Sequence, residues 1–358
     1  MAEAMRIGGL PVVTLRAPEP AERGFVSADI LPGRGMTTLQ IRARTPELGE
    51  FDVLASPSVE AAARLMDGGA GDYVGSKSFS LGGALLIPYA NRIRGRLSDD
   101  GRTIETEVGG RTVSLPANWG GRREGAERYA MHGLILDAAV PRHRIERRGD
   151  AEVMTAVLDP GDFGGRWVSS CRLAFEIALS SRAFEMRVMA TNVGDETLPI
   201  GIGWHPWFNL PSGKRDQVRM TLPARARTRV NDYDEVLPTG EVEAVQGTAY
   251  DFREGRALGQ LYLDDCFTDL ERPLGVAFED PAAAYCLEIT SASASVKAVQ
   301  VYAPPDRPVL VIEPQFNLAN PFGAEWAGRD TGMVRLEPGG AADYDVRLEL
   351  KRNLREQG

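Results

Sequence analysis

Only three of the 358 residues are histidines, so few side chains can exchange a proton near neutral pH. We expect His143, which lies in a run of alternating charged residues, to be structural. His132 is followed by Gly133, and His205 is surrounded by tryptophan and phenylalanine. A neighbouring glycine lets a ligand approach the backbone closely, which favours a binding site. The alternative for His205 is a core histidine in an aromatic cluster.

Three further segments place polar groups beside apolar runs. Glu313 follows a run of four apolar residues, Asn91 and Arg92 follow another, and Asp264 and Asp265 lie between apolar neighbours. A carboxylate is rarely buried without a partner or a purpose. Asparagine both donates and accepts hydrogen bonds, and the planar fork of arginine suits vicinal hydroxyls. The alternatives are a glutamate facing water, a turn asparagine beside a surface arginine, and a polar turn.

The elements that must position these residues are expected to be β-strands. Apolar and polar residues alternate with period two in 171–179, and the pattern resumes after Ser181 and Arg182 in 184–190, which predicts a hairpin. The same alternation recurs in 36–44, 153–158, 296–302 and 344–350. Clusters of the 39 glycines and 23 prolines separate these segments.

One segment, 56–68, predicts a helix, with Ser56 as its cap, Pro57 in the first turn and Gly68 at its end. No linker, repeat or change of composition divides the chain. We therefore predict an all-β protein, a large single-domain antiparallel β-sandwich with few short helices. Residues 1–23 would form an N-terminal extension or first strand, residues 24–352 the sandwich, and residues 353–358 a tail.

The composition excludes several classes of function. A net charge of −9 argues against a nucleic-acid partner, which requires a basic surface. Four of the 41 basic residues are lysines and 37 are arginines, so a lone arginine carries little information. The three cysteines form no C-x-x-C pair, and no signal peptide or membrane-spanning segment is evident. We expect a cytoplasmic protein that binds neither metal nor membrane.

Taken in chain order, these segments resemble the aldose 1-epimerase family, also called galactose mutarotases. The resemblance spans roughly residues 24 to 350. It depends on six short motifs: Asn91-Arg92-Ile93 with Gly95, His132-Gly133, Gly203-Trp204-His205-Pro206-Trp207-Phe208-Asn209, Asp264 to Phe267, Gln300-Val301-Tyr302, and Glu313-Pro314 with Asn320.

The resemblance implies a large antiparallel β-sandwich and a site that needs no cofactor. It implies that His205 is a general acid on the ring oxygen of a sugar and that Glu313 is a general base on the anomeric hydroxyl. It further implies that the sugar is held by Asn91, Arg92, His132, Asp264 and Gln300. Asp265 is the alternative to Asp264, and Trp119, Trp204 and Trp207 are candidate stacking platforms.

We therefore expect an isomerase that interconverts the α and β anomers of a free aldohexose, as a monomer or homodimer. The mechanism would place a protonated His205 and an ionised Glu313 on opposite sides of the sugar. One alternative is the same reaction on a hexose 6-phosphate, with a phosphate clamp drawn from Arg42, Arg94, Arg96 and Arg122. Another is a carbohydrate-binding protein without catalysis. A metal-dependent hydrolase or lyase would need ligand motifs that the sequence lacks.

Overall fold

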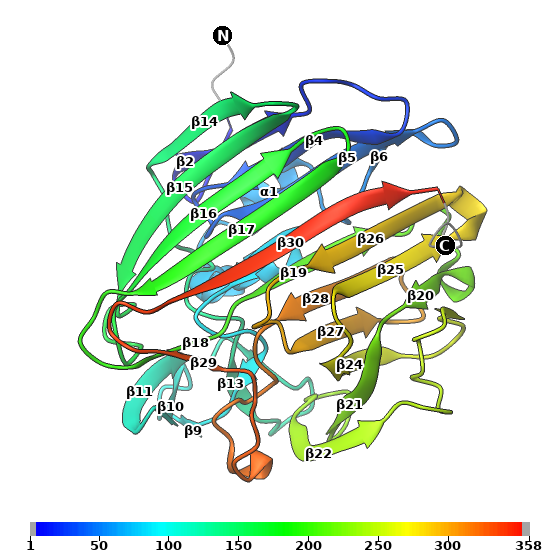
Figure 1. The fold of residues 1–358 in the computed structure, drawn as a ribbon. Coiled ribbons are helices and arrows are strands. Elements are labelled where there is room, and N and C mark those ends of the chain that lie inside the picture. The colour runs from blue at the N-terminus through cyan, green and yellow to red at the C-terminus, as the bar shows by residue number, and fades with distance from the viewer. Residues whose placement is uncertain (1–4, 353–358) are drawn as a thin grey trace.

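The computed structural model of the chain describes residues 5–352. The proposed tail, 353–358, lies outside the described residues. Most of the chain forms two large antiparallel sheets that pack face to face, as Figure 1 shows. This arrangement confirms the predicted β-sandwich.

One layer is a nine-stranded sheet, which faces the viewer in Figure 1. In spatial order its strands are β14 (His143–Arg148), β15 (Ala151–Gly161), β16 (Cys171–Leu179), β17 (Ala183–Asn192), β30 (Ala341–Lys351), β26 (Tyr285–Ser291), β25 (Leu274–Asp280), β20 (Arg219–Thr221) and β23 (Arg256–Ala257).

The other layer is an eleven-stranded sheet behind the first. Its strands, in spatial order, are β22 (Pro238–Ala244), β21 (Ala224–Val230), β24 (Leu263–Leu270), β27 (Ala298–Ala303), β28 (Val309–Gln315), β19 (Gly203–Asn209), β7 (Gly83–Leu86), β5 (Thr37–Thr45), β4 (Gly24–Leu31) and β3 (Val13–Arg16), with β6 (Gly49–Asp52) paired to β5. The segment before residue 24 thus contributes β3 to this sheet.

The main hydrophobic core fills the space between the two sheets. Trp204 of β19 stacks on Phe184 of β17 with ring centroids 5.9 Å apart, and Phe208 lies 5.4 Å from Phe278 of β25. The Tyr344 hydroxyl on β30 donates a 2.8 Å hydrogen bond to the Pro314 carbonyl on β28. These contacts join opposite sheets, so the two layers share one core.

Smaller elements cover the outer face and the ends of the sandwich. Four small sheets comprise β1 (Arg6–Ile7) with β2 (Leu10–Pro11), β9 (Arg96–Leu97) with β10 (Thr103–Val108) and β11 (Arg111–Pro116), β8 (Arg92–Ile93) with β12 (Trp119–Gly120) and β13 (Arg128–Met131), and β18 (Leu198–Ile200) with β29 (Val334–Leu336). The helical elements are α1 (Val59–Leu65) and the 3₁₀ segments η1 (Ala70–Ser80), η2 (Arg215–Gln217), η3 (Pro281–Ala283) and η4 (Ala324–Trp326). No helix in the described part of the chain is long and apolar enough to cross a membrane.

The predicted hairpin is present as β16 and β17. Phe175 pairs with Val188 and Ile177 with Met186, and these side chains are buried while their neighbours along each strand are more exposed. The strands predicted around 36–44, 153–158, 296–302 and 344–350 are also present. Period-two alternation located these strands because one face of each packs on the core.

The predicted helix begins later than expected. Ser58, rather than Ser56, is the cap, because its hydroxyl accepts a hydrogen bond from the Ala61 amide, and Pro57 precedes it. The helix ends at Leu65 with Met66 as its C-cap. The prediction of a helix here is therefore correct, with a shorter span.

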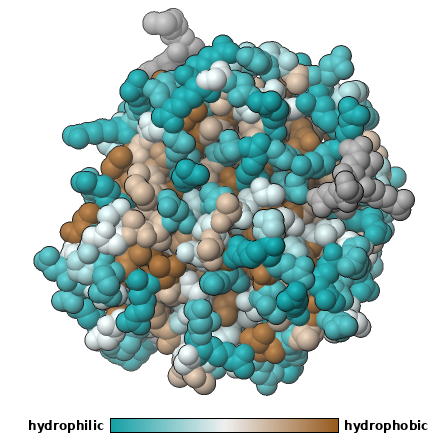
Figure 2. All heavy atoms as spheres, in the orientation of Figure 1, coloured by the Kyte–Doolittle hydropathy of each residue, from teal (hydrophilic) through white to brown (hydrophobic). Residues whose placement is uncertain are grey.

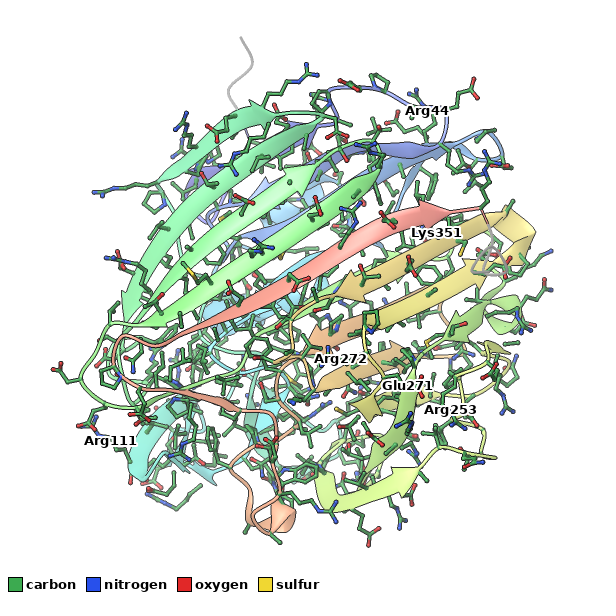
Figure 3. All side chains as sticks on the ribbon, in the orientation of Figure 1. Arg44, Arg111, Arg253, Glu271, Arg272 and Lys351 are labelled. Atoms are coloured by element: carbon green, nitrogen blue, oxygen red, sulfur yellow. The ribbon has the colours of Figure 1, made fainter. Side chains whose placement is uncertain are left out.

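The surface carries many charged side chains among scattered apolar ones, as Figure 2 shows for the face of the nine-stranded sheet. Arg44, Arg253 and Lys351, labelled in Figure 3, each pair with a nearby carboxylate. His143 is exposed at the start of edge strand β14, within the charged run.

Candidate active site

Four of the candidate residues come from four neighbouring strands of the eleven-stranded sheet. Asp264 lies on β24, Gln300 on β27, Glu313 on β28 and His205 on β19, and these strands are adjacent in that order. Gln300 and Glu313 are direct cross-strand partners. All four line a single cavity on the outer face of the sheet, opposite the face that packs on the core.

Alternation along β19 places some of the aromatic side chains of residues 203–209 in the core and others in the cavity. Trp204 is fully buried between the sheets, where its indole donates a 3.1 Å hydrogen bond to the Gly83 carbonyl. His205 and Trp207 line the cavity. Successive side chains of a strand point to opposite faces, so Trp204 cannot reach the cavity. Of the three candidate stacking platforms, Trp119 and Trp207 line the cavity and Trp204 belongs to the core.

The same rule distinguishes Asp264 from Asp265. Asp264 lines the cavity, whereas Asp265 is fully buried, pairs with Arg227 and accepts a 3.0 Å hydrogen bond from the Tyr233 hydroxyl. Because Asp265 is already bound by these two groups, its carboxylate is committed to the structure of the sheet. Asp264 is therefore the residue placed to contact a ligand.

The remaining candidates come from the small sheet of β8, β12 and β13, which covers one side of the cavity. Asn91 directly precedes β8, Arg92 is the first residue of β8, and His132 follows β13. Asn91 and His132 both have positive φ, 61° and 63°, and the His132 amide donates a 2.9 Å hydrogen bond to the Asn91 carbonyl. Positive φ is uncommon outside glycine and, where observed, often marks a functional site.

Asn91, Arg92, Asp264 and Gln300 form a ring of polar contacts, three hydrogen bonds and one ion pair. Asn91 Nδ2 donates to Gln300 Oε1 at 3.0 Å, and Gln300 Nε2 donates to Asp264 Oδ1 at 2.7 Å. The Arg92 guanidinium donates to Asn91 Oδ1 at 2.8 Å and lies 3.8 Å from Asp264 Oδ2. Each side chain is fixed by its neighbours, so the ring presents preorganised donors and acceptors to a polar ligand.

His205 and Glu313 are in direct contact at the bottom of the cavity. His205 Nε2 lies 3.3 Å from Glu313 Oε1, and both side chains are more than nine-tenths buried. Glu313 Oε2 and the Nδ1 atoms of His205 and His132 have no protein hydrogen-bond partner within the described residues. Buried polar atoms without partners are rare, so this group is arranged to receive polar atoms of a ligand.

Burial moves the pKa values of the pair in opposite directions. Burial lowers the pKa of His205 to about 4, and the positive charge of Arg92 adds to this effect. Burial raises the pKa of Glu313 well above 4.5, helped by the negative charge of Asp264 and opposed by Arg92. When the pair holds one proton, these directions favour that proton on Glu313 rather than on His205. This differs from the expected protonated histidine and ionised glutamate, although both forms hold one proton on the pair.

The cavity has a volume of about 370 Å³, within the range of small-molecule sites. All seven candidate residues line it. Aromatic rings form its walls: Phe79 lies 4.9 Å from His132 and 5.3 Å from Trp119, and Trp207 lies 5.8 Å from His205, all between ring centroids. An apolar wall beside a polar floor suits the ring of a sugar, which has both C–H faces and hydroxyl edges.

Sequence reasoning missed several lining residues, among them Phe79, Tyr233, Tyr262 and Arg307. Phe79 lies in the irregular segment η1, and Arg307 lies in the turn between β27 and β28. Neither segment has the alternation that marks a strand. Only the position of Arg307 between two motif-bearing strands, with Gln300 before it and Glu313 after it, could have drawn attention to it.

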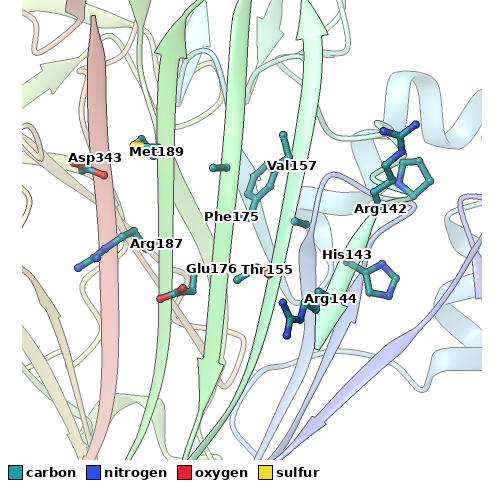
Figure 4. Close-up of a pocket in the computed structure, with 13 residues that line it drawn as sticks. Arg142, His143, Arg144, Thr155, Val157, Phe175, Glu176, Arg187, Met189 and Asp343 are labelled. Atoms are coloured by element: carbon teal, nitrogen blue, oxygen red, sulfur yellow. The ribbon is translucent and has the colours of Figure 1, made fainter. Parts of the chain in front are cut away.

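A second and larger hollow, of about 880 Å³, lies on the outer face of the nine-stranded sheet. Figure 4 shows His143 on one side of it and Glu176, Arg187 and Asp343 spread over three other strands. His143, Arg187 and Asp343 are exposed, and no acid and base are buried together there. The smaller cavity is therefore the candidate active site.

The fold also creates a potential metal-binding cluster that has no motif in the sequence. Ligand atoms of His132, His205 and Glu313 lie within 4.8 Å of one another. Two imidazoles and one carboxylate are ligands that suit zinc and other transition metals. The absence of ligand motifs from the sequence therefore does not exclude a metal site, because the fold brings three residues from distant segments together.

Comparisons with known proteins agree with this geometry. The family model described as aldose 1-epimerase matches residues 64–348. A galactose mutarotase-like protein from Clostridium acetobutylicum superposes with a TM-score of 0.71 at 19% identity, covering 92% of this chain and 93% of that one. An aldose epimerase homologue from C. elegans gives 0.68 at 16%, covering 95% and 98%, and a galactose 1-epimerase from Lactobacillus acidophilus NCFM gives 0.66 at 17%, covering 96% and 99%.

At these identities the solved structures establish the fold and not the activity. A comparison with curated proteins returns no match. The family model, however, covers most of the chain, including every candidate residue of the cavity. The chain therefore belongs to the aldose 1-epimerase family.

Proposed function

We propose that the protein is a mutarotase, an isomerase that interconverts the α and β anomers of an aldose. The observation that carries this proposal is the contact between His205 and Glu313, 3.3 Å apart, on the floor of a cavity ringed by hydrogen-bonding side chains. A pair that holds one proton can give a proton to one oxygen while taking a proton from another. Opening a cyclic hemiacetal requires this exchange.

In the ring-opening step, the Glu313 carboxylate removes the proton from O1 of the sugar. The O1 electrons form the C1=O1 double bond, the C1–O5 bond breaks, and His205 donates a proton to O5. The product is the open-chain aldehyde, with neutral His205 and protonated Glu313. Rotation about C1–C2 presents the other face of the carbonyl, and the reverse transfers close the ring as the other anomer.

The acid and the base act from the same side of the cavity, not from opposite sides as the sequence analysis expected. O1 and O5 are both bonded to C1, so the two oxygens are neighbours. His205 and Glu313 are in contact in the free protein. A sugar that binds between them can therefore bring O5 to His205 and O1 to Glu313. Two hydrogen bonds to the sugar would replace the single contact between His205 and Glu313.

Sugar binding must also move the proton of the pair from Glu313 to His205. A hydrogen bond donated by the O1 hydroxyl to the Glu313 carboxylate stabilises its ionised form and lowers its pKa. The state favoured in the free protein, neutral His205 with protonated Glu313, is the state that accompanies the open-chain sugar.

The ring of polar contacts formed by Asn91, Arg92, Asp264 and Gln300, together with His132, would hold the hydroxyls of the sugar. Trp119 and Trp207 offer apolar surfaces to its C–H faces. These groups suit the free aldohexose that the sequence analysis expects. A cytoplasmic location, and a monomer or homodimer, remain predictions from the sequence.

A metal-dependent reaction is the second candidate, because His132, His205 and Glu313 could ligate a divalent ion. That role would occupy the atoms that mutarotation requires for proton transfer. The two candidates therefore predict opposite effects of a chelator: no effect on mutarotation, or complete loss of activity.

Polarimetry tests the proposal. Fresh α-glucose and α-galactose should approach equilibrium faster with the protein than without it, in the presence or absence of EDTA. His205→Asn should reduce the enzymatic rate by about 10² to 10⁴, the contribution of a positioned acid or base. Binding of the sugar by calorimetry without any acceleration would overturn the proposal and favour a carbohydrate-binding protein.

A further inference from the structure

Three side chains of types that bind metal ions converge on the floor of the cavity. His205 Nε2 lies 3.3 Å from Glu313 Oε1, and ligand atoms of these two residues and of His132 lie within 4.8 Å of one another. All three residues are more than nine-tenths buried. No other group of three histidine, cysteine or carboxylate side chains comes together in this way within residues 5–352. The cluster is therefore a specific feature of this cavity.

The spacing of the cluster fits a tetrahedral ion. Two ligands that each bind zinc at about 2.1 Å lie about 3.4 Å apart, along one edge of the tetrahedron. The 3.3 Å between His205 Nε2 and Glu313 Oε1 matches this edge. The ring centroids of His132 and His205 are 4.8 Å apart, so a small shift of His132 would add the third ligand. Two imidazoles and one carboxylate form the protein ligands of many zinc sites.

The charges on the floor also favour a cation. Arg92 and Asp264 face each other at 3.8 Å, so their opposite charges offset each other, and they act on Glu313 in opposite directions. An ionised Glu313 therefore leaves a net negative charge on the floor. Its Oε2 atom has no protein hydrogen-bond partner among the described residues. A divalent ion supplies the compensation that a buried carboxylate requires.

The surroundings of the histidines distinguish an exchangeable ion from a resident one. In a resident metal centre, the histidine nitrogen that does not bind the metal donates a hydrogen bond to a carboxylate, a carbonyl or water. His205 faces Glu313 with Nε2, and its Nδ1 has no protein hydrogen-bond partner within residues 5–352. The Nδ1 atom of His132 also has none there. We therefore expect an ion that binds reversibly rather than a permanent cofactor.

Such an ion and the sugar would exclude each other. In the proposed function, His205 donates a proton to O5 and Glu313 removes a proton from O1. A metal ligand must be deprotonated, so an ion bound to both residues takes the lone pairs that would carry these protons. The ion also holds the two side chains close together, whereas the sugar binds between them.

We propose that the floor of the cavity is an inhibitory site for a divalent transition metal, which binds His132, His205 and Glu313 in competition with the sugar. This inference rests on the proposed function and concerns the regulation of the same site. Zinc and copper suit the donor set, because imidazole nitrogen is a good ligand for both. Magnesium does not, because it prefers oxygen ligands in octahedral geometry.

Exchange NMR with glucose tests the inhibition. Mutarotation is measured at several glucose concentrations with increasing Zn²⁺, in a buffer that does not bind metal. Zn²⁺ at about nine times its dissociation constant should raise the apparent KM about tenfold. The kcat should not change, because saturating sugar displaces the ion. EDTA should restore the original rate, and Mg²⁺ at the same concentrations should have no effect.

Titration with Co²⁺ measures metal binding without reference to activity. Co²⁺ with four ligands absorbs visible light more strongly than the hydrated ion, and added glucose should reverse this absorbance. His132→Gln and Glu313→Gln should each weaken Co²⁺ binding by about tenfold or more. Glutamine has the shape of glutamate, so Glu313→Gln separates loss of the ligand from loss of the fold. The matched control is His143→Gln, which removes the exposed third histidine outside the cavity and should bind Co²⁺ as the wild type does.

The outcomes separate this inference from the proposed function. Three results would each overturn the inference and leave the mutarotase proposal intact: mutarotation that Zn²⁺ does not slow, inhibition that lowers kcat without raising KM, or Co²⁺ binding that neither cavity variant weakens. A protein that fails to accelerate the mutarotation of glucose and galactose in EDTA would overturn both.

Discussion

At the scale of single residues, Glu313 is deeply buried, although the proposed reaction requires its carboxylate to be ionised. One carboxylate oxygen contacts His205 and the other has no protein partner among residues 5–352. Burial of an ionised carboxylate is costly, so the folded protein raises the pKa of this group. Glu313 therefore destabilises the folded protein at neutral pH, as is expected for a buried carboxylate that a reaction requires.

We predict that Glu313→Gln stabilises the protein increasingly as pH rises. The folded-state pKa of Glu313 is raised, so the folded protein keeps a proton that the unfolded chain loses above about pH 4.5. The contribution of Glu313 to the free energy of unfolding is therefore fully present below about pH 4.5. It is lost as the pH rises toward the pKa of Glu313 in the folded protein. Glutamine avoids this loss, which approaches about 1.4 kcal/mol per pH unit.

Urea unfolding of the wild type and the variant at pH 5 and pH 7 measures this effect. The control is Glu185→Gln, an exposed glutamate on β17 that pairs with Arg347. Its stability relative to the wild type should change little between the two pH values. A Glu313→Gln advantage that does not grow from pH 5 to pH 7 would show that Glu313 is ionised in the folded protein.

The sequence indicated the residue types of the site, but not their protonation or the face of the sheet on which each side chain lies. Sequence reasoning named seven of the residues that line the cavity, partly from the family resemblance, and left Asp264 and Asp265 unresolved. The choice between them depends on register, because a shift of one residue moves a side chain to the other face. The pKa directions depend on burial, which a strand's own sequence does not specify.

At the scale of elements, β19 shows how one strand serves both the core and the site. Trp204 and Phe208 point toward the nine-stranded sheet, while His205 and Trp207 line the cavity. Phe184 on β17 supports Trp204 from the opposite layer. The position of the acid is thus set by packing on the other face of its own strand.

This division predicts different effects for two tryptophans on the same strand. Trp204→Ala should destabilise the protein by about 3–5 kcal/mol, because it removes a fully buried side chain and leaves a cavity. Trp207→Ala should cost less stability, because its side chain is only half-buried, but it should weaken sugar binding.

Chemical denaturation and sugar titration, applied to both variants, check this prediction. Trp207 also donates a 2.8 Å hydrogen bond from its indole to the Phe79 carbonyl, so some loss of stability is expected in that variant. Equal destabilisation by the two substitutions, with unchanged sugar affinity in Trp207→Ala, would show that Trp207 belongs to the core.

The alternation that predicted the strands could not predict the irregular segments. Phe79 reaches the cavity from η1, which has non-helical φ and ψ values at Asp72, Tyr73, Val74 and Gly75. Arg307 reaches it from a turn. Such segments are set by contacts with the rest of the fold, so their side chains become part of a site without any periodic signal.

At the scale of the whole molecule, the site is assembled from segments that are far apart in the chain. β19 and β28 are neighbours in the large sheet, although β20 to β27 lie between them in sequence. The composition and strand pattern predicted a single antiparallel sandwich. They could not give the order of strands, because that order depends on long-range pairing that local residues do not encode.

The distribution of charge is also a property of the whole molecule. The chain has a net charge of −9, yet Arg122 and Arg307 line the cavity and form no ion pair with a carboxylate of residues 5–352. The sequence contains 37 arginines, so it does not show which of them lie at a functional site. In the fold Arg42, Arg94 and Arg96 pair with carboxylates, whereas Arg122 and Arg307 line the cavity.

The mutarotase proposal requires this assembly to transfer protons between His205, Glu313 and the anomeric centre of an aldose. Its most direct test is the rate of exchange between α and β anomers at equilibrium, measured by NMR with the wild type, Glu313→Gln and the surface control Glu185→Gln. We predict that the wild type and the control accelerate exchange equally and that Glu313→Gln reduces the acceleration by about 10² to 10⁴. Acceleration by Glu313→Gln at the wild-type rate would contradict the account.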